Sequence, residues 1–408
     1  MRSHVPAFAS AGNADASFFE NAAGSFACRQ TIEALTSFST DTKVQPYSTY
    51  GPSKTAGEQM DVSRTRWAEA LGVEANEVTF GPSTSMNTYV FAEAFGQRLS
   101  PGDEVIVTNQ DHEANTGSTR RMAQRVGCTV REWTIDEMTG LLDIDTFGSL
   151  VTDRTRLVTV PHASNIVGKE NDIGRICELS HRVGARVIVD GVSFAPHTIP
   201  DAAALGADVY LFSLYKTYSV HQGLMVVRRG LLDELPNQSH FFNDSVSDKR
   251  LNPAGPDHAQ VASAGAVLDF IQAVHTQHGG QETDPLRQAC SEVSTLWRHH
   301  ENSMTPRLLG AVDGNERLQL LGPATLDATP GHRCPTVAFS PLSMEPSELL
   351  LELSNRGIQT SAGHFYAWRV LDGLGVDPER GVVRLSFVHY TSADDIDRVI
   401  TALDDIVR

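Results

Sequence analysis

The sequence predicts an α/β protein with a large domain on a mainly parallel seven-stranded sheet and a smaller C-terminal α/β domain. Three observations lead to this prediction. Seven apolar, strand-like runs alternate with segments of helical periodicity, and a turn-rich stretch at 237–260 follows them. Strand and helix patterns resume beyond that stretch. A chain of 408 residues is also too long for one simple core.

The seven strand-like runs define the expected large sheet. Their alternation with helical patterns favours parallel strands, joined by right-handed crossovers and wrapped by helices. The runs lie at 77–80, 104–108, 129–133, 157–160, 187–189, 209–212 and 224–227.

The C-terminal third predicts a second, smaller unit. Two helical patterns follow, at 261–274 and 283–302, and the second leads out of the large domain. The turn-rich stretch before them is expected to be an ordered surface or interface loop. The smaller unit then follows, with strands at 336–339 and 382–387 and helices at 345–356 and 393–406. The expected division is an N-terminal segment, a large domain and a small domain with which the segment is a candidate to pack, at 1–17, 18–280 and 281–408.

The bulk composition restricts the partners and the compartment. A net charge of -17 argues against nucleic acid or an anionic membrane as the main partner, and simple solubility accounts for it. We expect neither a secretory signal in the first residues nor a membrane-spanning segment. The five cysteines are odd in number and scattered, without the paired spacing of disulfides or metal sites, which favours the reducing cytoplasm.

Polar side chains follow two of the apolar runs. Asp190 ends the run at 187–189, and Ser213 and Lys216 follow the run at 209–212. The carboxyl ends of strands in an open α/β sheet border the ligand crevice. Pyridoxal phosphate (PLP) requires a lysine for covalent attachment and a carboxylate facing its ring nitrogen. A capping aspartate and a surface lysine would explain either residue alone, but the combination predicts a PLP site with Ser213 on the phosphate.

Two stretches, VIVDGVSFAPH and ALGADVYLFSLYKTYSVHQG, contain Asp190 and Lys216. They resemble the cysteine desulfurase-like group of class V aminotransferases, which are fold-type I PLP enzymes. The resemblance extends from FFENAAGS, at 18–25, to VHYTS, at 388–392. It implies the fold-type I transferase fold and a homodimer with active sites near the subunit interface.

The resemblance assigns further residues to the cofactor. Thr84 and Ser85 match two phosphate-binding threonines, although an ordinary helix N-cap would also explain them. His112 matches the histidine that stacks on the pyridine ring, and an imidazole there is also suited to handling protons. Asn165 matches an asparagine near the ring oxygen and the substrate carboxylate. His197 is equally consistent with a pocket residue and with a histidine in the following turn whose hydrogen bonds are satisfied.

Three positions depart from the family pattern. Ser193 stands where desulfurases have a glutamine on the ring oxygen, so that contact is expected to be lost or made through water. Tyr215 replaces the histidine that usually precedes the lysine. Gly255 stands where a threonine of the partner subunit would reach the phosphate, so that contact is expected to be absent or made by a backbone amide.

The segment expected to contact the substrate differs most from the desulfurase pattern. Tyr366 stands at the position of the persulfide-forming cysteine, and no cysteine lies within twenty residues of it. Because a phenol cannot carry a persulfide, sulfur relay through this loop is excluded. His364 and Tyr366 are candidates to donate a proton or shape the pocket, and a purely structural role is equally consistent. Arg384 matches the arginine that clamps the substrate carboxylate.

These residues predict a PLP-dependent enzyme with Lys216, Asp190 and His112 as the catalytic residues. The favoured reaction is carbon–sulfur lysis, or a related β-elimination or β-replacement, on a cysteine-derived amino acid. An aminotransferase or epimerase of the same fold is the alternative. A PLP-binding regulatory protein without catalysis is the third hypothesis, and intact Lys216, Asp190 and Arg384 argue against it.

Overall fold

The computed structural model describes residues 1–326 and 333–407. Its larger unit contains a seven-stranded sheet in the order β2-β8-β7-β6-β5-β3-β4. All neighbouring strands are parallel except β8, which is antiparallel to both β2 and β7. The mainly parallel seven-stranded sheet is therefore confirmed. Its strands are β2 (Val78–Gly81), β3 (Glu104–Thr108), β4 (Thr129–Trp133), β5 (Thr155–Pro161), β6 (Arg186–Asp190), β7 (Val209–Ser213) and β8 (Gly223–Val227).

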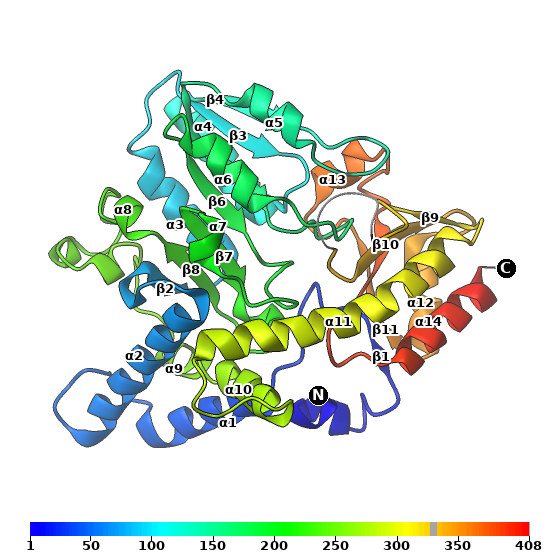
Figure 1. Ribbon diagram of the computed structural model, residues 1–408, viewed down its shortest axis with the longest axis horizontal. Helices are drawn as coiled ribbons and strands as arrows, with labels where there is room; N and C mark the ends of the chain where they lie inside the picture. The colour runs from blue at the N-terminus through cyan, green and yellow to red at the C-terminus, as the bar shows by residue number, and fades with distance from the viewer. Residues whose placement is uncertain (327–332, 408) are drawn as a thin grey trace.

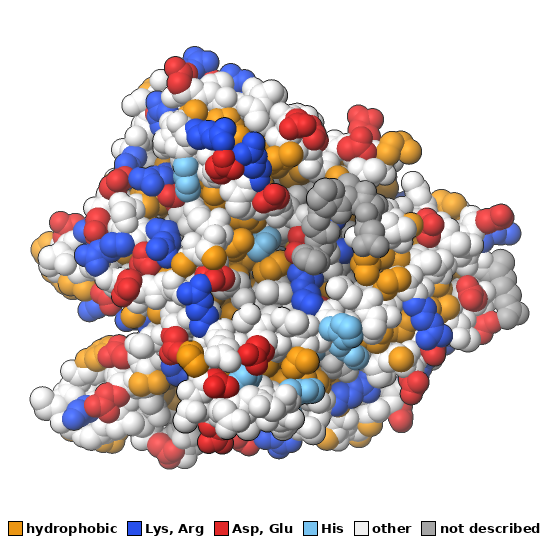
Figure 2. All heavy atoms as spheres, in the orientation of Figure 1, with side chains coloured by type: hydrophobic (Ala, Val, Ile, Leu, Met, Phe, Trp, Pro, Cys, Tyr) orange, Lys and Arg blue, Asp and Glu red, His pale blue; other side chains and the backbone are white. Residues whose placement is uncertain are grey.

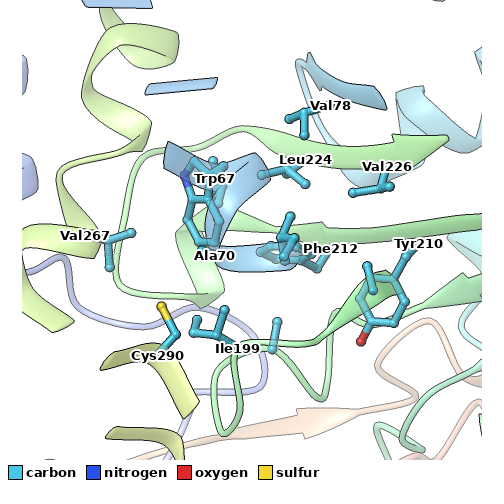
Figure 3. Close-up of a cluster of buried hydrophobic side chains, with 14 of the residues drawn as sticks. Trp67, Ala70, Val78, Ile199, Tyr210, Phe212, Leu224, Val226, Val267 and Cys290 are labelled. Carbon is cyan, nitrogen blue, oxygen red and sulfur yellow. The ribbon is translucent and has the colours of Figure 1, made fainter. Parts of the chain in front are cut away.

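Apart from the edge strand β4, most of which is exposed or only partly buried, the strands of this sheet are buried on both faces, as the apolar runs predict. In β6, Val187 and Val189 belong to one apolar cluster and Ile188 belongs to another. β7 alternates in the same way, with Phe212 in the first cluster and Leu211 in the second. Figure 3 shows Phe212 in the first cluster together with side chains from outside the sheet.

Helices cover the two faces (Figure 1). The α3 and α4 helices pack on the face of Ile188, whereas α2, α6, α9, α10 and the start of α11 contribute to the opposite cluster. The helices of this unit are α1 (Arg29–Ser37), α2 (Gly51–Leu71), α3 (Thr84–Gly96), α4 (Glu113–Val126), α5 (Ile144–Leu150), α6 (Ile173–His181), α7 (Ala202–Leu205), α8 (Arg229–Leu232), α9 (His258–Ala264) and α10 (Val267–Gln277).

The helix expected at 261–274 is wrong as a single element, because α9 ends at Ala264 and α10 begins at Val267. The break falls at Gly265, whose backbone approaches α2. A Cβ at Gly265 would lie 3.0 Å from the Cα of Ser63. This close approach between helices requires glycine and has no signature in the apolar periodicity.

The C-terminal unit contains a four-stranded antiparallel sheet in the order β12-β13-β10-β9. One side of it packs on helices around a separate apolar core that includes Phe339, Leu349 and Val399. The strands are β9 (Leu318–Leu320), β10 (Thr336–Pro341), β12 (Ser361–Gly363) and β13 (Val382–Ser386), and the helices are α12 (Pro346–Asn355), α13 (Trp368–Gly373) and α14 (Ala393–Ile406).

One long helix, α11 (Leu286–Asp313), connects the two units (Figure 1). Trp297 belongs to the core of the large unit, whereas Leu308 belongs to the C-terminal core. The helix predicted at 283–302 is therefore too short. Helix α11 continues through Pro306 because its apolar side chains pack against the core of the large unit before the proline and against the C-terminal core after it.

The first residues of the chain pack with the C-terminal unit. β1 (Ser17–Phe18) pairs in parallel with β11 (Ile358–Gln359). Arg2 forms an ion pair with Asp395 at the start of α14. In the described part of the chain, no helix has the length and apolar character needed to cross a membrane. Acidic and basic side chains are interspersed over the face seen in Figure 2.

Candidate active site

A cavity of about 540 Å³ lies at the edge of the large sheet where β6 and β7 end, and the C-terminal unit contributes to its wall. This volume is typical of small-molecule sites. Of the site residues expected from the sequence, all line the cavity except His364 and His197, the latter of which was equally consistent with a structural role. The lining residues among them are Thr84, Ser85, His112, Asn165, Asp190, Ser193, Ser213, Lys216, Tyr366 and Arg384.

Lys216 and Asp190 reach this cavity from neighbouring parallel strands. Asp190 is the last residue of β6, and a single 3-10 turn, η5 (Leu214–Lys216), follows β7 and presents the lysine. Burial lowers the pKa of Lys216 to about 8, with Arg384 acting in the same direction and Asp190 opposing it. Burial raises the pKa of Asp190 to about 6, against its hydrogen bond from the Val192 amide and the charge of Lys216.

Each of these two groups suits one part of PLP. A lysine with a lowered pKa has more of its neutral, nucleophilic form near pH 7, which is what attachment to an aldehyde requires. A buried carboxylate that lacks a full ionic partner is stabilised by a protonated ring nitrogen beside it. The pair therefore fits the cofactor through its charge states as well as its position.

A cradle for a phosphate lies at the N-terminus of α3. Thr84 and Ser85 occupy the first turn of this helix, and the hydroxyls of Thr84 and Ser213 are 2.7 Å apart. Ser83 caps the helix by accepting the Met86 amide at 3.2 Å. Hydroxyls and free amides at a helix N-terminus are a favourable environment for an anion. The residues present therefore fit the phosphate of PLP.

Gly223 of β8 keeps the cradle open, since a Cβ at this position would lie 2.5 Å from the Thr84 amide nitrogen. We expect Gly223→Ala to push the Ser83–Thr84 turn away and to raise the dissociation constant for PLP about tenfold or more, because overpacking of this kind costs about 1–3 kcal/mol. Titration of cofactor-free protein with PLP measures the change. Gly230→Ala is the matched control, because a Cβ there meets nothing within 4 Å. Unchanged PLP affinity in Gly223→Ala would contradict this account of the cradle.

His112 caps α4 with its own ring. Its Nδ1 accepts the Ala114 amide at 3.0 Å, which leaves Nε2 as the nitrogen able to carry a proton. Burial lowers the pKa of His112 to about 3, and the charges of Lys216 and Arg384 act in the same direction. A neutral ring in the cavity wall is compatible with stacking on a pyridine ring. It does not favour a protonated imidazole at pH 7.

Arg384 reaches the cavity from β13 of the C-terminal unit. The residue is buried, and its Nη1 donates to the carbonyl oxygen of Asn165 at 3.1 Å. Asn165 in turn donates from Nδ2 to the carbonyl oxygen of Phe365 at 3.0 Å. A guanidinium held in this way on the cavity wall can bind a carboxylate.

The loop expected at the substrate end forms the rim of the cavity. Tyr366 is 67% exposed, and its ring centroid lies 5.3 Å from that of His112. His364 does not line the cavity, and its Nδ1 accepts the Tyr366 amide at 3.1 Å. His364 therefore shapes the rim, whereas the Tyr366 ring lies at the entrance.

His197 and Gly255 do not line this cavity. His197 is buried, and its Nδ1 lies 3.0 Å from a carboxylate oxygen of Glu301 on α11. Of the two interpretations of His197, the geometry supports the structural one. Gly255 lies in the turn-rich stretch between α8 and α9.

Among the lining residues to which the sequence assigned no role are Asp111 and Tyr215. Asp111 is buried, accepts the His112 amide and the side-chain amide of Asn115, and its pKa is raised by burial and by the charge of Asp190. The ring of Tyr215 stacks on His221 with centroids 4.7 Å apart. The sequence signal for Asp111 was its adjacency to His112, and that for Tyr215 was its place at a position where the chain departs from the family pattern, directly before Lys216.

Comparison with known proteins identifies the family. The class V aminotransferase family matches residues 17–399. The chain belongs to this family. It is 31% identical to the aminotransferase-like protein FGM3 of Gibberella zeae over 96% of this chain and 94% of that protein. A probable cysteine desulfurase of Mycolicibacterium paratuberculosis is 30% identical over 86% of this chain and 50% of its own length.

The fold is similar to that of a cysteine desulfurase from Thermococcus onnurineus NA1, with a TM-score of 0.85 and 20% sequence identity over 100% of this chain and 97% of that chain. The expected fold-type I architecture is thereby confirmed. Class V aminotransferases are PLP enzymes that act on small amino-acid substrates, so this protein is a PLP-dependent enzyme and the cofactor prediction is confirmed. Within residues 1–326 and 333–407, no group of three or more His, Cys, Asp or Glu side chains is placed to hold a metal ion.

Proposed function

We propose that this class V aminotransferase relative is a carbon–sulfur lyase, or a related β-elimination or β-replacement enzyme, acting on a cysteine-derived amino acid. One observation carries the proposal. The cavity combines Lys216, Asp190 and Arg384 with a phenol, Tyr366, which the family resemblance aligns with the desulfurase cysteine. The desulfurase relatives make sulfur chemistry the first hypothesis.

Each of the main residues of the cavity is assigned one role in the proposed reaction. Arg384 binds the α-carboxylate of the substrate, Lys216 takes the proton from its α-carbon, and Asp190 holds a proton on the ring nitrogen of the cofactor. When bound, PLP supplies a ring that draws electrons from that carbon. His112 stacks on the ring, Thr84, Ser85 and Ser213 contact the phosphate, and Asn165 lies near the ring oxygen, which Ser193 would reach only through water.

Sulfur is proposed to leave as a free thiol or sulfide, without a protein persulfide. The α-carbon loses its proton, the carbon–sulfur bond breaks, and the sulfur takes up a proton. The remaining three-carbon enamine hydrolyses to pyruvate and ammonia. None of the five cysteines lines the cavity, and burial raises the pKa of Cys177 and Cys290 to about 12, which suppresses the nucleophilic thiolate.

An aminotransferase or epimerase is the alternative, because the same Lys216 and Asp190 serve those reactions. A screen of amino acids against the purified PLP-loaded enzyme separates them. Keto acid released together with sulfide supports the lyase. Conversion of the cofactor to its pyridoxamine form identifies transamination, and inversion of the α-carbon identifies an epimerase. PLP uptake without turnover of any amino acid supports the regulatory hypothesis.

Tyr366→Phe tests the phenol at the rim. If the hydroxyl protonates the departing sulfur, the rate should fall about 10²-fold or more with substrates whose leaving group is poor and change little with activated ones. Comparison of kcat for two substrates with different leaving-group pKa values measures this difference. An equal loss on both substrates would assign the phenol to positioning, and no loss on either would assign it to the structure of the loop.

We further propose that the protein is a cytoplasmic homodimer whose subunit interface lies near the cavity. Several large side chains near the entrance are exposed, among them Met86, Tyr89, Tyr366 and Trp368, which supports an interface there. The stretch containing α9 and α10 is expected to contribute as well. The five cysteines are all free, as in a reducing compartment. A fully active monomer at micromolar concentration in sedimentation would contradict the dimer.

A further inference from the structure

Phe365 contacts the carboxylate-binding arginine, although the proposed reaction gives it no role. The Cζ of Arg384 lies over the Phe365 ring, 3.8 Å from the ring centroid. A guanidinium at this distance is attracted by the face of an aromatic ring, and more strongly when water is excluded. Both residues line the cavity. The contact therefore lies where the substrate carboxylate is proposed to bind.

The remaining contacts of Arg384 leave donors free. Nη1 is used by the carbonyl oxygen of Asn165, whereas Nε is buried without a hydrogen-bond partner among the described residues. The N–H bonds of a guanidinium lie in its plane, so a ring against one face does not compete with a carboxylate at the edge. Stacking on Phe365 instead restricts the orientation of that plane.

Phe365 itself is held in an unfavourable backbone conformation. Its φ is +51° and that of Tyr366 is +56°, in the left-handed region that residues other than glycine rarely adopt. Two contacts hold these residues there. The carbonyl oxygen of Phe365 accepts from Asn165 at 3.0 Å, and that of Tyr366 accepts from the Glu113 amide at 2.8 Å. Strain of this kind persists where the surrounding structure enforces it and is concentrated at functional sites.

We propose that Phe365 is a positioning residue that orients Arg384 for the substrate's α-carboxylate. Asn165 completes the arrangement, because it contacts both residues through its backbone and its side chain. The inference rests on the proposed role of Arg384. It adds that the rim loop contributes to carboxylate recognition through the ring of Phe365, independently of the chemistry at Tyr366.

Binding of propionate to the PLP-loaded enzyme tests this proposal without turnover, because propionate has a carboxylate but no amino group. Thermal-shift titration gives its dissociation constant for the wild type and the variants. Phe365→Leu should weaken binding about tenfold, the size expected for a desolvated cation–aromatic contact. Phe365→Tyr keeps the ring and should restore binding to within about twofold of the wild type. Phe365→Met provides the same comparison if the leucine variant does not fold.

A double-mutant cycle supplies the decisive control. In an Arg384→Ala background, Phe365→Leu should have no further effect on propionate binding, because the ring acts only through the guanidinium. Equal weakening in both backgrounds would overturn the proposal, as would wild-type affinity in Phe365→Leu when Arg384→Ala binds poorly. Wild-type affinity in Arg384→Ala would overturn the carboxylate role of Arg384 itself and the inference with it.

Discussion

Replacement of Lys216 by alanine is expected to abolish turnover of every amino acid that the enzyme accepts. The lysine is proposed both to anchor the cofactor and to take the α-carbon proton, and loss of a positioned proton acceptor alone lowers a rate by about 10²–10⁴-fold. Steady-state kcat at saturating PLP measures the loss. The fold should remain intact, because the variant removes a group whose charged form is disfavoured by burial in this cavity.

Lys54→Ala is the matched control for this variant. Lys54 lies on α2, outside the residues that line the cavity, and its side chain is 69% exposed. The control should keep full activity and the same melting temperature as the wild type. Activity of Lys216→Ala within about tenfold of the wild type would show that another group takes the proton.

Asp190→Asn is expected to lower turnover by about 10²–10⁴-fold, since removal of one partner from a buried charge pair costs about 3–5 kcal/mol and each 1.36 kcal/mol corresponds to tenfold in rate. The amide keeps the shape of the side chain but cannot hold a proton on the ring nitrogen. The visible absorption of the PLP-loaded variant and its kcat are the measurements. Asp153→Asn on the exposed surface is the control. Wild-type kcat in Asp190→Asn would exclude the proposed role.

The same variant should change the pH dependence of stability in the cofactor-free protein. The pKa of Asp190 is raised to about 6 by burial, so the folded state retains a proton that the unfolded state has already lost above about pH 4. The contribution of Asp190 to stability therefore falls as the pH rises from about 4 to about 6. At pH 8 cofactor-free Asp190→Asn should melt above the wild type, and the difference should shrink toward pH 4.

Much of the large sheet and of the candidate site was predictable because strands buried on both faces are continuous apolar runs in the sequence. The strands β6 and β7 appear as continuous apolar runs, and each ends in polar residues at the edge where ligands bind. Two strands therefore indicated Asp190 and Lys216 by position alone. Arg384 carries no such signal within β13, and only the family resemblance identified it.

Other features depend on contacts between distant segments and could not be predicted locally. The stacking of Arg384 on Phe365 and their shared partner Asn165 bring together three separate stretches of chain. His197 pairs with Glu301, which lies far along the sequence on α11, so its structural role required tertiary information. Asp111 resembles an ordinary residue at the start of a helix, and only its burial beside Asp190 distinguishes it.

Reduction of the PLP-loaded enzyme with borohydride, followed by peptide mass spectrometry, tests the central claim most directly. Borohydride makes the link between the cofactor and its lysine permanent, so the modified residue can be identified. A single pyridoxyl adduct is expected on the peptide that contains Lys216, and none in Lys216→Ala. An adduct on another lysine, or no adduct in a protein saturated with PLP, would contradict the proposed role of Lys216.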